Sequence, residues 1–170
     1  LHKKLAFESS VSNAVGEALT VAGEYHQGQT RKSDGSPYIN HLREVLALLL
    51  SIAKVTDETI LIAAVLHDTL EDTELPKAAI KRAYGEEVLT LIEQVTDDKS
   101  KPLDVRRHAA LIHLEDTSEA VKLIKLADII SNANALPDWD EIRLAKYLAW
   151  LDAVALRCRE ASKPLYDVYI

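Results

Sequence analysis

Apolar residues recur along this chain at the spacing of a helix. Leu5, Val11, Val15, Leu19 and Ala22 follow one another at intervals of three, four and six residues, and no segment keeps for long the strict alternation typical of a half-buried strand. The pattern predicts helices at residues 3–27, 40–53, 57–71, 75–84, 86–96, 103–113, 118–135, 139–161 and 163–168. We therefore expect an all-α fold, a helical bundle of about eight to ten helices.

Residues typical of helix ends support these limits. Asp57 and Ser118 can accept hydrogen bonds from the free N–H groups of a first turn. Pro76 suits the start of a helix, and Gly85 separates two short ones.

The longest segment between predicted helices, residues 27–38, is rich in Gly, Ser, Asp and Pro, which favour turns. It nevertheless carries Arg31 and Lys32 at its centre. Loops held by rigid helices frequently carry binding residues. The two basic side chains are therefore candidates for contacts with an anionic ligand, the alternative being two solvated charges on a linker.

Composition narrows the class of protein. A chain of 170 residues, 48% hydrophobic and 28% charged, is typical of one globular domain spanning residues 1–170. A net charge of −7 disfavours duplex nucleic acid as a partner, because phosphate binding there requires a continuous basic face. The net charge does not exclude a small anionic substrate, because binding one requires only local positive charge. The oligomeric state is not readable from these features.

The apolar runs 45–53 and 60–66 are too short to cross a bilayer, which takes about 20 residues, so we expect no membrane partner. No secretory signal pattern opens the chain, and the single cysteine, Cys158, cannot form an internal disulfide. These features predict a cytoplasmic protein in which Cys158 serves packing.

A cluster of ionisable residues ends the apolar segment 59–66. On a helix, Glu71 shares a face with His67 and Asp68, and Asp72 shares one with Asp68, because residues three or four apart are neighbours. Carboxylates this close repel and raise one another's pKa unless a cation lies between them. The cluster therefore suggests a metal site.

Two further residues can complete such a site. His41 begins an apolar helix, and Asp128 interrupts the apolar run 123–130, where an unpaired carboxylate is costly to bury. Each also has a simpler explanation: His41 as a satisfied core histidine, and Asp128 as a partner of Lys125. Jointly, two nitrogen and two oxygen ligands suit a divalent ion such as Mn²⁺, and Zn²⁺ is less favoured because no thiolate takes part. The predicted metal ligands are His41, His67, Asp68 and Asp128.

Four separated motifs occur in a characteristic order. They are R-K…G-x-P-Y-x-x-H at 31–41, H-D-x-x-E-D-T at 67–73, V-T-D-D-K-S at 95–100 and K-L-A-D-x-x-x-N at 125–132. Over residues 20–136 the chain resembles the HD-domain hydrolases of the RelA/SpoT type, which degrade the alarmones ppGpp and pppGpp. It is too short for the synthetase and regulatory domains of the long members. It is therefore similar to the stand-alone small alarmone hydrolases, the Mesh1-like proteins.

The resemblance implies an HD-domain bundle, a single Mn²⁺ per chain on the four ligands and a metal-dependent 3′-pyrophosphohydrolase that leaves GDP or GTP. Glu71 and Asp72 would position and activate the attacking water, with Asp72 closest to a general base. Arg31 and Lys32 would flank the base and phosphates, and Asn132 would contact the ribose region. Lys99 and Arg106 are left outside the predicted site.

One departure concerns the nucleoside. Where the bifunctional relatives continue with Arg and Thr, this chain has Asn134 and Ala135. Alternatives therefore remain open: the same site acting on ppApp, or removing the 2′-phosphate of NADPH. A site with two metal ions would need further ligands, but His108 and His113 are five residues apart and face different sides of a helix. A catalytically silent nucleotide-binding HD domain is the remaining alternative.

Overall fold

The computed structural model describes residues 12–170, and in these residues the all-α prediction is confirmed. The helices, in chain order, are α2 (Asn13–Tyr25), α3 (Ile39–Ser51), α4 (Glu58–Leu66), α5 (Thr69–Asp72), α6 (Lys77–Tyr84), α7 (Glu86–Val95), α8 (Leu103–His113), α9 (Glu119–Ala133), α10 (Glu141–Cys158), a 3-10 turn (Arg159–Ala161) and α11 (Lys163–Tyr169). Within the described part, β structure is limited to an isolated antiparallel bridge between Thr30 and Pro37. The predicted residues 3–11 of the first helix lie outside the described range.

The predicted helix 57–71 is wrong as one element, because the structure divides it into α4 and α5 at His67 and Asp68. Two side chains cause the break. His67 Nδ1 lies 2.7 Å from the carbonyl oxygen of Ala64, and Thr69 Oγ1 donates to the carbonyl of Leu66 at 2.7 Å. Helix α4 ends here because these side chains occupy the carbonyl oxygens that the backbone N–H groups of a further helical turn would otherwise bind.

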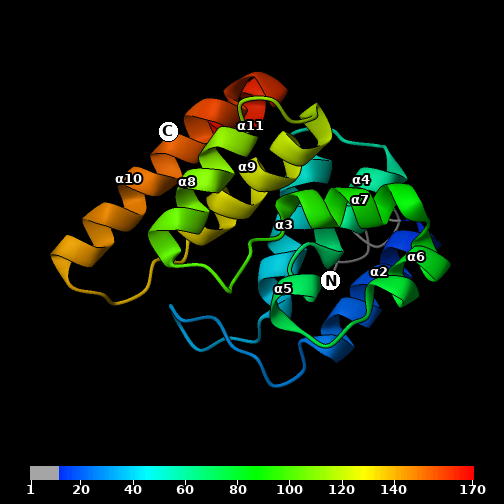
Figure 1. The fold of residues 1–170 in the computed structure, drawn as a ribbon. Helices are drawn as coiled ribbons and strands as arrows, with labels where there is room; N and C mark the ends of the chain where they lie inside the picture. The colour runs from blue at the N-terminus through cyan, green and yellow to red at the C-terminus, as the bar shows by residue number, and fades with distance from the viewer. Residues whose placement is uncertain (1–11) are drawn as a thin grey trace, which may run out of the picture.

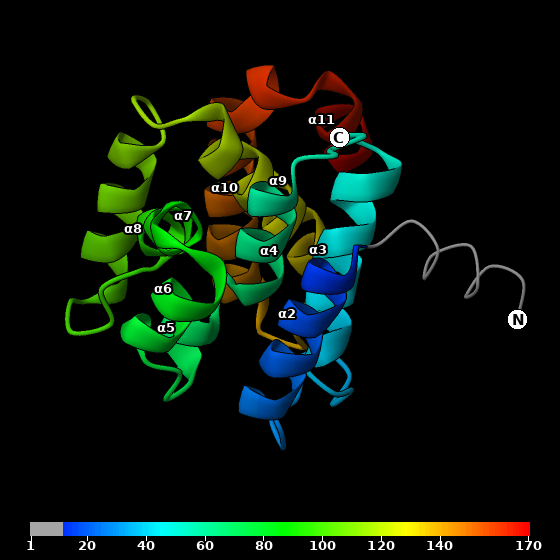
Figure 2. The same cartoon turned by 90° about the vertical axis from the view of Figure 1, so that its right-hand side faces the viewer.

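Helix α4 lies in the interior of the bundle. Every residue from Leu61 to Leu66 is buried, and α4 packs against α2, α3, α7 and α9. Figure 2 shows it between α7 on one side and α2 and α3 on the other. A helix that is apolar all round is stable only when surrounded in this way, so α4 holds the turn at its end in a defined place.

Helix α9 supplies the second wall of the core. It is buried over most of its length, including the polar Asp128 and Ser131, and it packs against α3, α7 and α10. Figure 1 shows α9 behind α8 and alongside α10. The packing of α3 on α9 and of α4 on both brings the start of α3, the middle of α9 and the end of α4 to one place.

Two further expectations bear on the fold. Cys158 is fully buried at the end of α10, as expected of a packing residue. Among residues 12–170, none of the helices combines the length and apolar character required to cross a bilayer.

Candidate active site

The side chains of the predicted metal ligands converge from α3, α9 and the turn between α4 and α5. Ligand atoms of His41, His67 and Asp128 all lie within 4.8 Å of one another, and these residues are buried. Asp68 joins them, with its Oδ2 at 3.0 Å from His67 Nε2 and 3.6 Å from His41 Nε2. Asp128 Oδ1 lies 3.3 Å from His41 Nε2 and 3.7 Å from His67 Nε2.

The chemistry of these atoms fits a bound cation. The carbonyl of Ala64 can only accept a hydrogen bond, so His67 carries a proton on Nδ1 and, when neutral, a lone pair on Nε2. The buried Nε2 atoms of His41 and His67 have no hydrogen-bond partner among the described residues. Lone pairs that face carboxylate oxygens this closely repel unless a positive charge lies between them.

The charged groups around Asp128 lower the pKa of its carboxyl group. Burial alone would raise its pKa, but the Lys125 ammonium, 3.4 Å from Oδ2, and the two imidazoles hold the pKa of Asp128 well below its usual range. The pairing with Lys125 that sequence reasoning offered as an alternative therefore coexists with the cluster, because the two carboxylate oxygens face different partners.

The pKa of His67 is shifted upward. Burial opposes a charged imidazole, but the carboxylates of Asp68 and Asp128 outweigh it and raise the pKa of His67 well above its usual value. Without a metal ion, these carboxylates therefore favour the protonated imidazole. A divalent cation would replace this proton at the same place.

Further side chains orient the carboxylates. Tyr38 Oη donates to Asp68 Oδ2, and burial together with the Asp68 charge raises the pKa of the Tyr38 phenol. Asn132 Nδ2 donates to Asp128 Oδ1 at 2.7 Å, so the residue expected to contact ribose also holds a predicted ligand. Sequence reasoning missed Tyr38, although it stands in the G-x-P-Y-x-x-H motif.

The predicted catalytic pair lies on α5. Glu71 Oε2 accepts a hydrogen bond from the backbone N–H of Asp97 at 3.1 Å, and burial raises the pKa of Glu71. Lys99 pairs with Asp72 and lies 3.4 Å from Glu71 Oε1. Lys99, which was left outside the predicted site, is therefore a part of it. Its place in the V-T-D-D-K-S motif was the available signal.

The two basic residues of the 27–38 loop differ in position. Lys32 is exposed. Arg31 is buried, with Nη1 donating to Glu44 Oε2 at 2.8 Å and Nη2 donating to the Ser131 carbonyl at 2.8 Å. The loop thus presents Lys32 to solvent while the guanidinium of Arg31 is directed into the protein.

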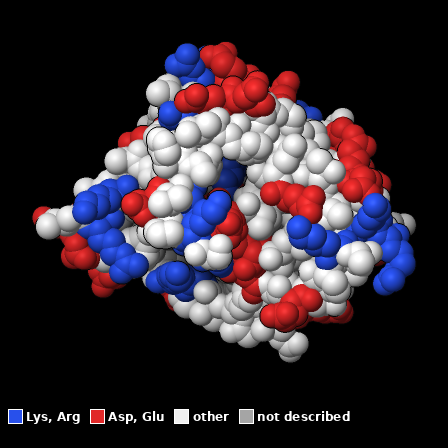
Figure 3. Space-filling view, viewed as in Figure 1, with Lys and Arg blue, Asp and Glu red and all other residues white. Residues whose placement is uncertain are grey.

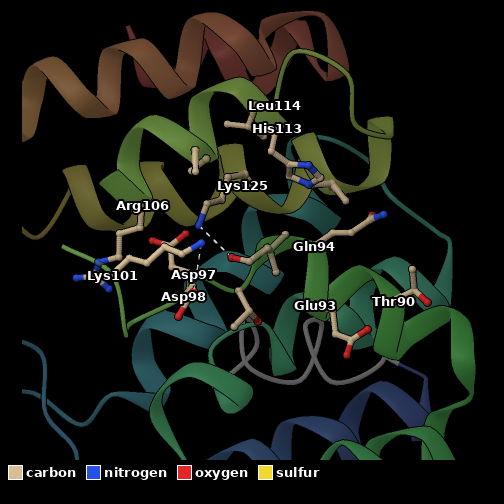
Figure 4. Close-up of a pocket in the computed structure, with 15 residues that line it drawn as sticks. Thr90, Glu93, Gln94, Asp97, Asp98, Lys101, Arg106, His113, Leu114 and Lys125 are labelled. Carbon is tan, nitrogen blue, oxygen red and sulfur yellow. Dashed lines mark hydrogen bonds and ion pairs between the residues drawn. The ribbon is translucent and has the colours of Figure 1, made fainter. Parts of the chain in front are cut away.

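A hollow of about 550 Å³ lies between α7, α8 and α9, and its lining includes Lys125 but none of the predicted metal ligands. Figure 3 shows basic and acidic side chains side by side at a hollow in this face. Figure 4 shows Lys101, Arg106 and Lys125 around it together with Asp97 and Asp98. The hollow meets the predicted site at Lys125, the partner of Asp128.

The possible ligands of a second metal ion lie elsewhere. His108 and His113 are exposed on α8, a helix with no buried residue. Neither belongs to the group of potential ligands found among residues 12–170. These two histidines therefore do not lie with the predicted ligands.

Comparison with known proteins defines the class. A family model described as HD domain matches residues 18–147, so the chain belongs to the HD-domain family. It is 38% identical over 163 residues to the guanosine-3′,5′-bis(diphosphate) 3′-pyrophosphohydrolase MESH1 of Xenopus tropicalis, covering 92% of this chain and 91% of that protein. It is 39% identical over 157 residues to the Homo sapiens MESH1, covering 89% and 88%.

A solved structure described as a metazoan ortholog of SpoT that hydrolyzes ppGpp matches with a TM-score of 0.88 at 33% identity. The match covers 94% of this chain and 93% of the other. The resemblance predicted from the four motifs is confirmed.

Proposed function

We propose that this protein is a metal-dependent (p)ppGpp 3′-pyrophosphohydrolase that releases pyrophosphate and leaves GDP or GTP. The observation that carries the proposal is the convergence of His41, His67, Asp68 and Asp128 in the described residues. The MESH1 relatives and the ppGpp-hydrolyzing structural relative support it. We expect the protein to act on small nucleotides in the cytoplasm.

His41, His67, Asp68 and Asp128 would hold one Mn²⁺ per chain on two imidazole nitrogens and two carboxylates, a donor set suited to this ion. When bound, the cation would supply Lewis-acid polarisation of the phosphoryl oxygens and of the attacking water. Tyr38 and Asn132 keep the carboxylates oriented by their hydrogen bonds to Asp68 and Asp128.

The acidic pair performs the proton transfer. Asp72 takes the proton of the attacking water at its carboxylate, and Glu71 assists from the same short helix. Lys99 holds both carboxylates and compensates their charge next to an anionic substrate. Lys32 contacts the substrate phosphates from the exposed loop, and Asn132 lies beside the ribose.

The experiment incubates the purified protein with ppGpp and Mn²⁺ and follows products by phosphorus NMR. The expected product is pyrophosphate. The variant Asp72→Asn should lower kcat by about 100-fold or more while leaving Mn²⁺ affinity within a few-fold, since removal of a general base costs about 10²–10⁴ in rate. Asp116→Asn, an exposed position with no side-chain partner among residues 12–170, is the matched control. Near-normal turnover by Asp72→Asn would refute its assignment.

A second candidate keeps the site and changes the substrate to ppApp or to NADPH, from which the 2′-phosphate would be removed. This candidate needs a test because the chain has Asn134 and Ala135 where the bifunctional relatives have Arg and Thr. NADPH would yield orthophosphate and either alarmone pyrophosphate, so the same NMR measurement identifies NADPH dephosphorylation, and the rates with ppGpp and ppApp separate the two alarmones. Binding of ppGpp without any product would instead identify a silent domain.

A further inference from the structure

A chain of polar contacts leads away from His41 on the side opposite the carboxylates and ends at the half-exposed Glu44. His41 Nδ1 lies 2.9 Å from Ser131 Oγ, and Ser131 Oγ lies 2.6 Å from Glu44 Oε2. Ser131 is fully buried on α9, and His41 is 1% exposed. The contacts join α3 to α9 directly behind the predicted metal ligand.

The direction of each hydrogen bond follows from the number of protons available. A serine hydroxyl has one proton to donate. Glu44 Oε2 accepts from Arg31 Nη1 at 2.8 Å, which marks it as an acceptor, so the Ser131 proton points to Glu44. The opposite orientation would leave two oxygens facing each other at 2.6 Å with no proton between them.

Ser131 Oγ must then accept from His41, and the His41 proton is held on Nδ1. The neutral imidazole consequently directs the lone pair of Nε2 toward Asp68 and Asp128. This is the tautomer that can bind a metal ion through Nε2. In its neutral form His67 has the same tautomer for a different reason, because a backbone carbonyl, and no side chain, accepts from its Nδ1.

Arg31 completes the arrangement. Its guanidinium donates to Glu44 through Nη1 and to the Ser131 carbonyl through Nη2, and its side chain is 8% exposed. A bidentate contact to a side chain on α3 and a backbone oxygen on α9 fixes both neighbours of His41 at once. The buried guanidinium therefore acts within the protein.

We propose that Ser131 and Glu44, held by Arg31, are positioning residues that set the tautomer and orientation of His41 for metal binding. The inference rests on the proposed metal site. Outer partners of this kind typically change metal affinity by about 10–100-fold when removed. Arg31 is thereby assigned to support of the metal site, and Lys32 remains the basic residue of the loop that faces the substrate.

The test measures Mn²⁺ affinity by calorimetry and the protonation of each histidine nitrogen by ¹⁵N NMR of the metal-free protein. We expect Ser131→Ala to weaken Mn²⁺ binding about 10–100-fold and to disturb the Nδ1–H signal of His41 while that of His67 is unchanged. Ser131→Thr, which keeps the hydroxyl, should restore affinity. Glu44→Gln, at a side chain that is 47% exposed and so tolerant of change, should give a partial loss.

Glu87→Gln on α7, an exposed position with the same change of charge, is the control and should match the wild type. The proposal is overturned if Ser131→Ala and Glu44→Gln both fold and retain wild-type Mn²⁺ affinity and His41 signals. It is equally overturned if His41 in the wild type carries its proton on Nε2 alone. A wild-type protein that binds no divalent ion would instead refute the proposed function, while the NMR measurement would still decide the role of Ser131.

Discussion

Replacing Lys125 by Met tests the electrostatic balance of the predicted metal centre. The Lys125 ammonium lies 3.4 Å from Asp128 Oδ2 and 3.5 Å from the Val95 carbonyl, and the two charged side chains are 12% and 10% exposed. Met keeps the volume of the aliphatic stem and removes the charge. The variant therefore leaves a buried carboxylate without its cationic partner.

The magnitude follows from the distance. Unit charges at 3.4 Å attract by about 5 kcal/mol at an effective dielectric constant of about 20. Breaking a buried pair costs about 3–5 kcal/mol, and the proton on His67 offsets part of this, so we expect a loss of about 3 kcal/mol in the metal-free protein. With a divalent ion bound, Asp128 is compensated, and the loss falls to about 1 kcal/mol for the hydrogen bond to Val95.

The expected losses of stability without and with the metal ion differ by about 2 kcal/mol, and thermodynamic linkage requires the same difference in the free energy of Mn²⁺ binding. It means that Lys125→Met should bind Mn²⁺ about 30-fold more tightly than the wild type, because a like charge near the ion is removed. Urea unfolding with and without Mn²⁺ measures the stabilities, and the metal-free midpoint should fall by about 1.5 M at a slope of about 2 kcal/mol per M.

Lys122→Met on the same helix is the matched control. Lys122 has no ion pair in the described residues, so its replacement should change stability by less than about 0.5 kcal/mol. If Lys125→Met lost the same stability with and without Mn²⁺, or bound the ion more weakly, the electrostatic argument would be refuted.

Three further predictions concern the frame of the site. Asp57 accepts a hydrogen bond from the Thr59 N–H at 2.9 Å, so Asp57→Ala should destabilise the protein by about 1 kcal/mol in urea unfolding. Leu126 is fully buried on α9, and Leu126→Ala should cost about 2–5 kcal/mol, with an unchanged melting temperature contradicting the packing. Burial raises the pKa of the Cys158 thiol to about 12, so iodoacetamide at pH 8 should label it quickly only in urea. The thiol has a higher pKa in the folded than in the unfolded protein, so its contribution to stability is complete below about pH 9 and is lost as the pH rises toward 12. Cys158→Ala should remove this part of the fall in the free energy of unfolding with pH.

Much of the architecture follows from local pattern. Helical periodicity and end residues predicted most helices to within a few residues, because side-chain spacing and capping act between near neighbours in the chain. Asp57 and Ser118 cap their helices as predicted, each accepting a backbone hydrogen bond. The predicted ligands could be proposed from the sequence because His67 and Asp68 open a cluster of ionisable residues, and His41 and Asp128 are polar residues next to or within apolar runs.

The tertiary structure alone decided which partners those residues have. Arg31 donates to the carbonyl of Ser131, which is 100 positions away, and Lys99 reaches Asp72 across 27 positions. Such contacts depend on how α3, α9 and the loops pack, which spacing within one helix does not report. The residue types were therefore sufficient to predict a metal site on an all-α frame. Only the packing of α3 against α9 determined that Arg31 faces inward and that Ser131 lies behind His41, because proximity between distant segments is a property of the folded chain.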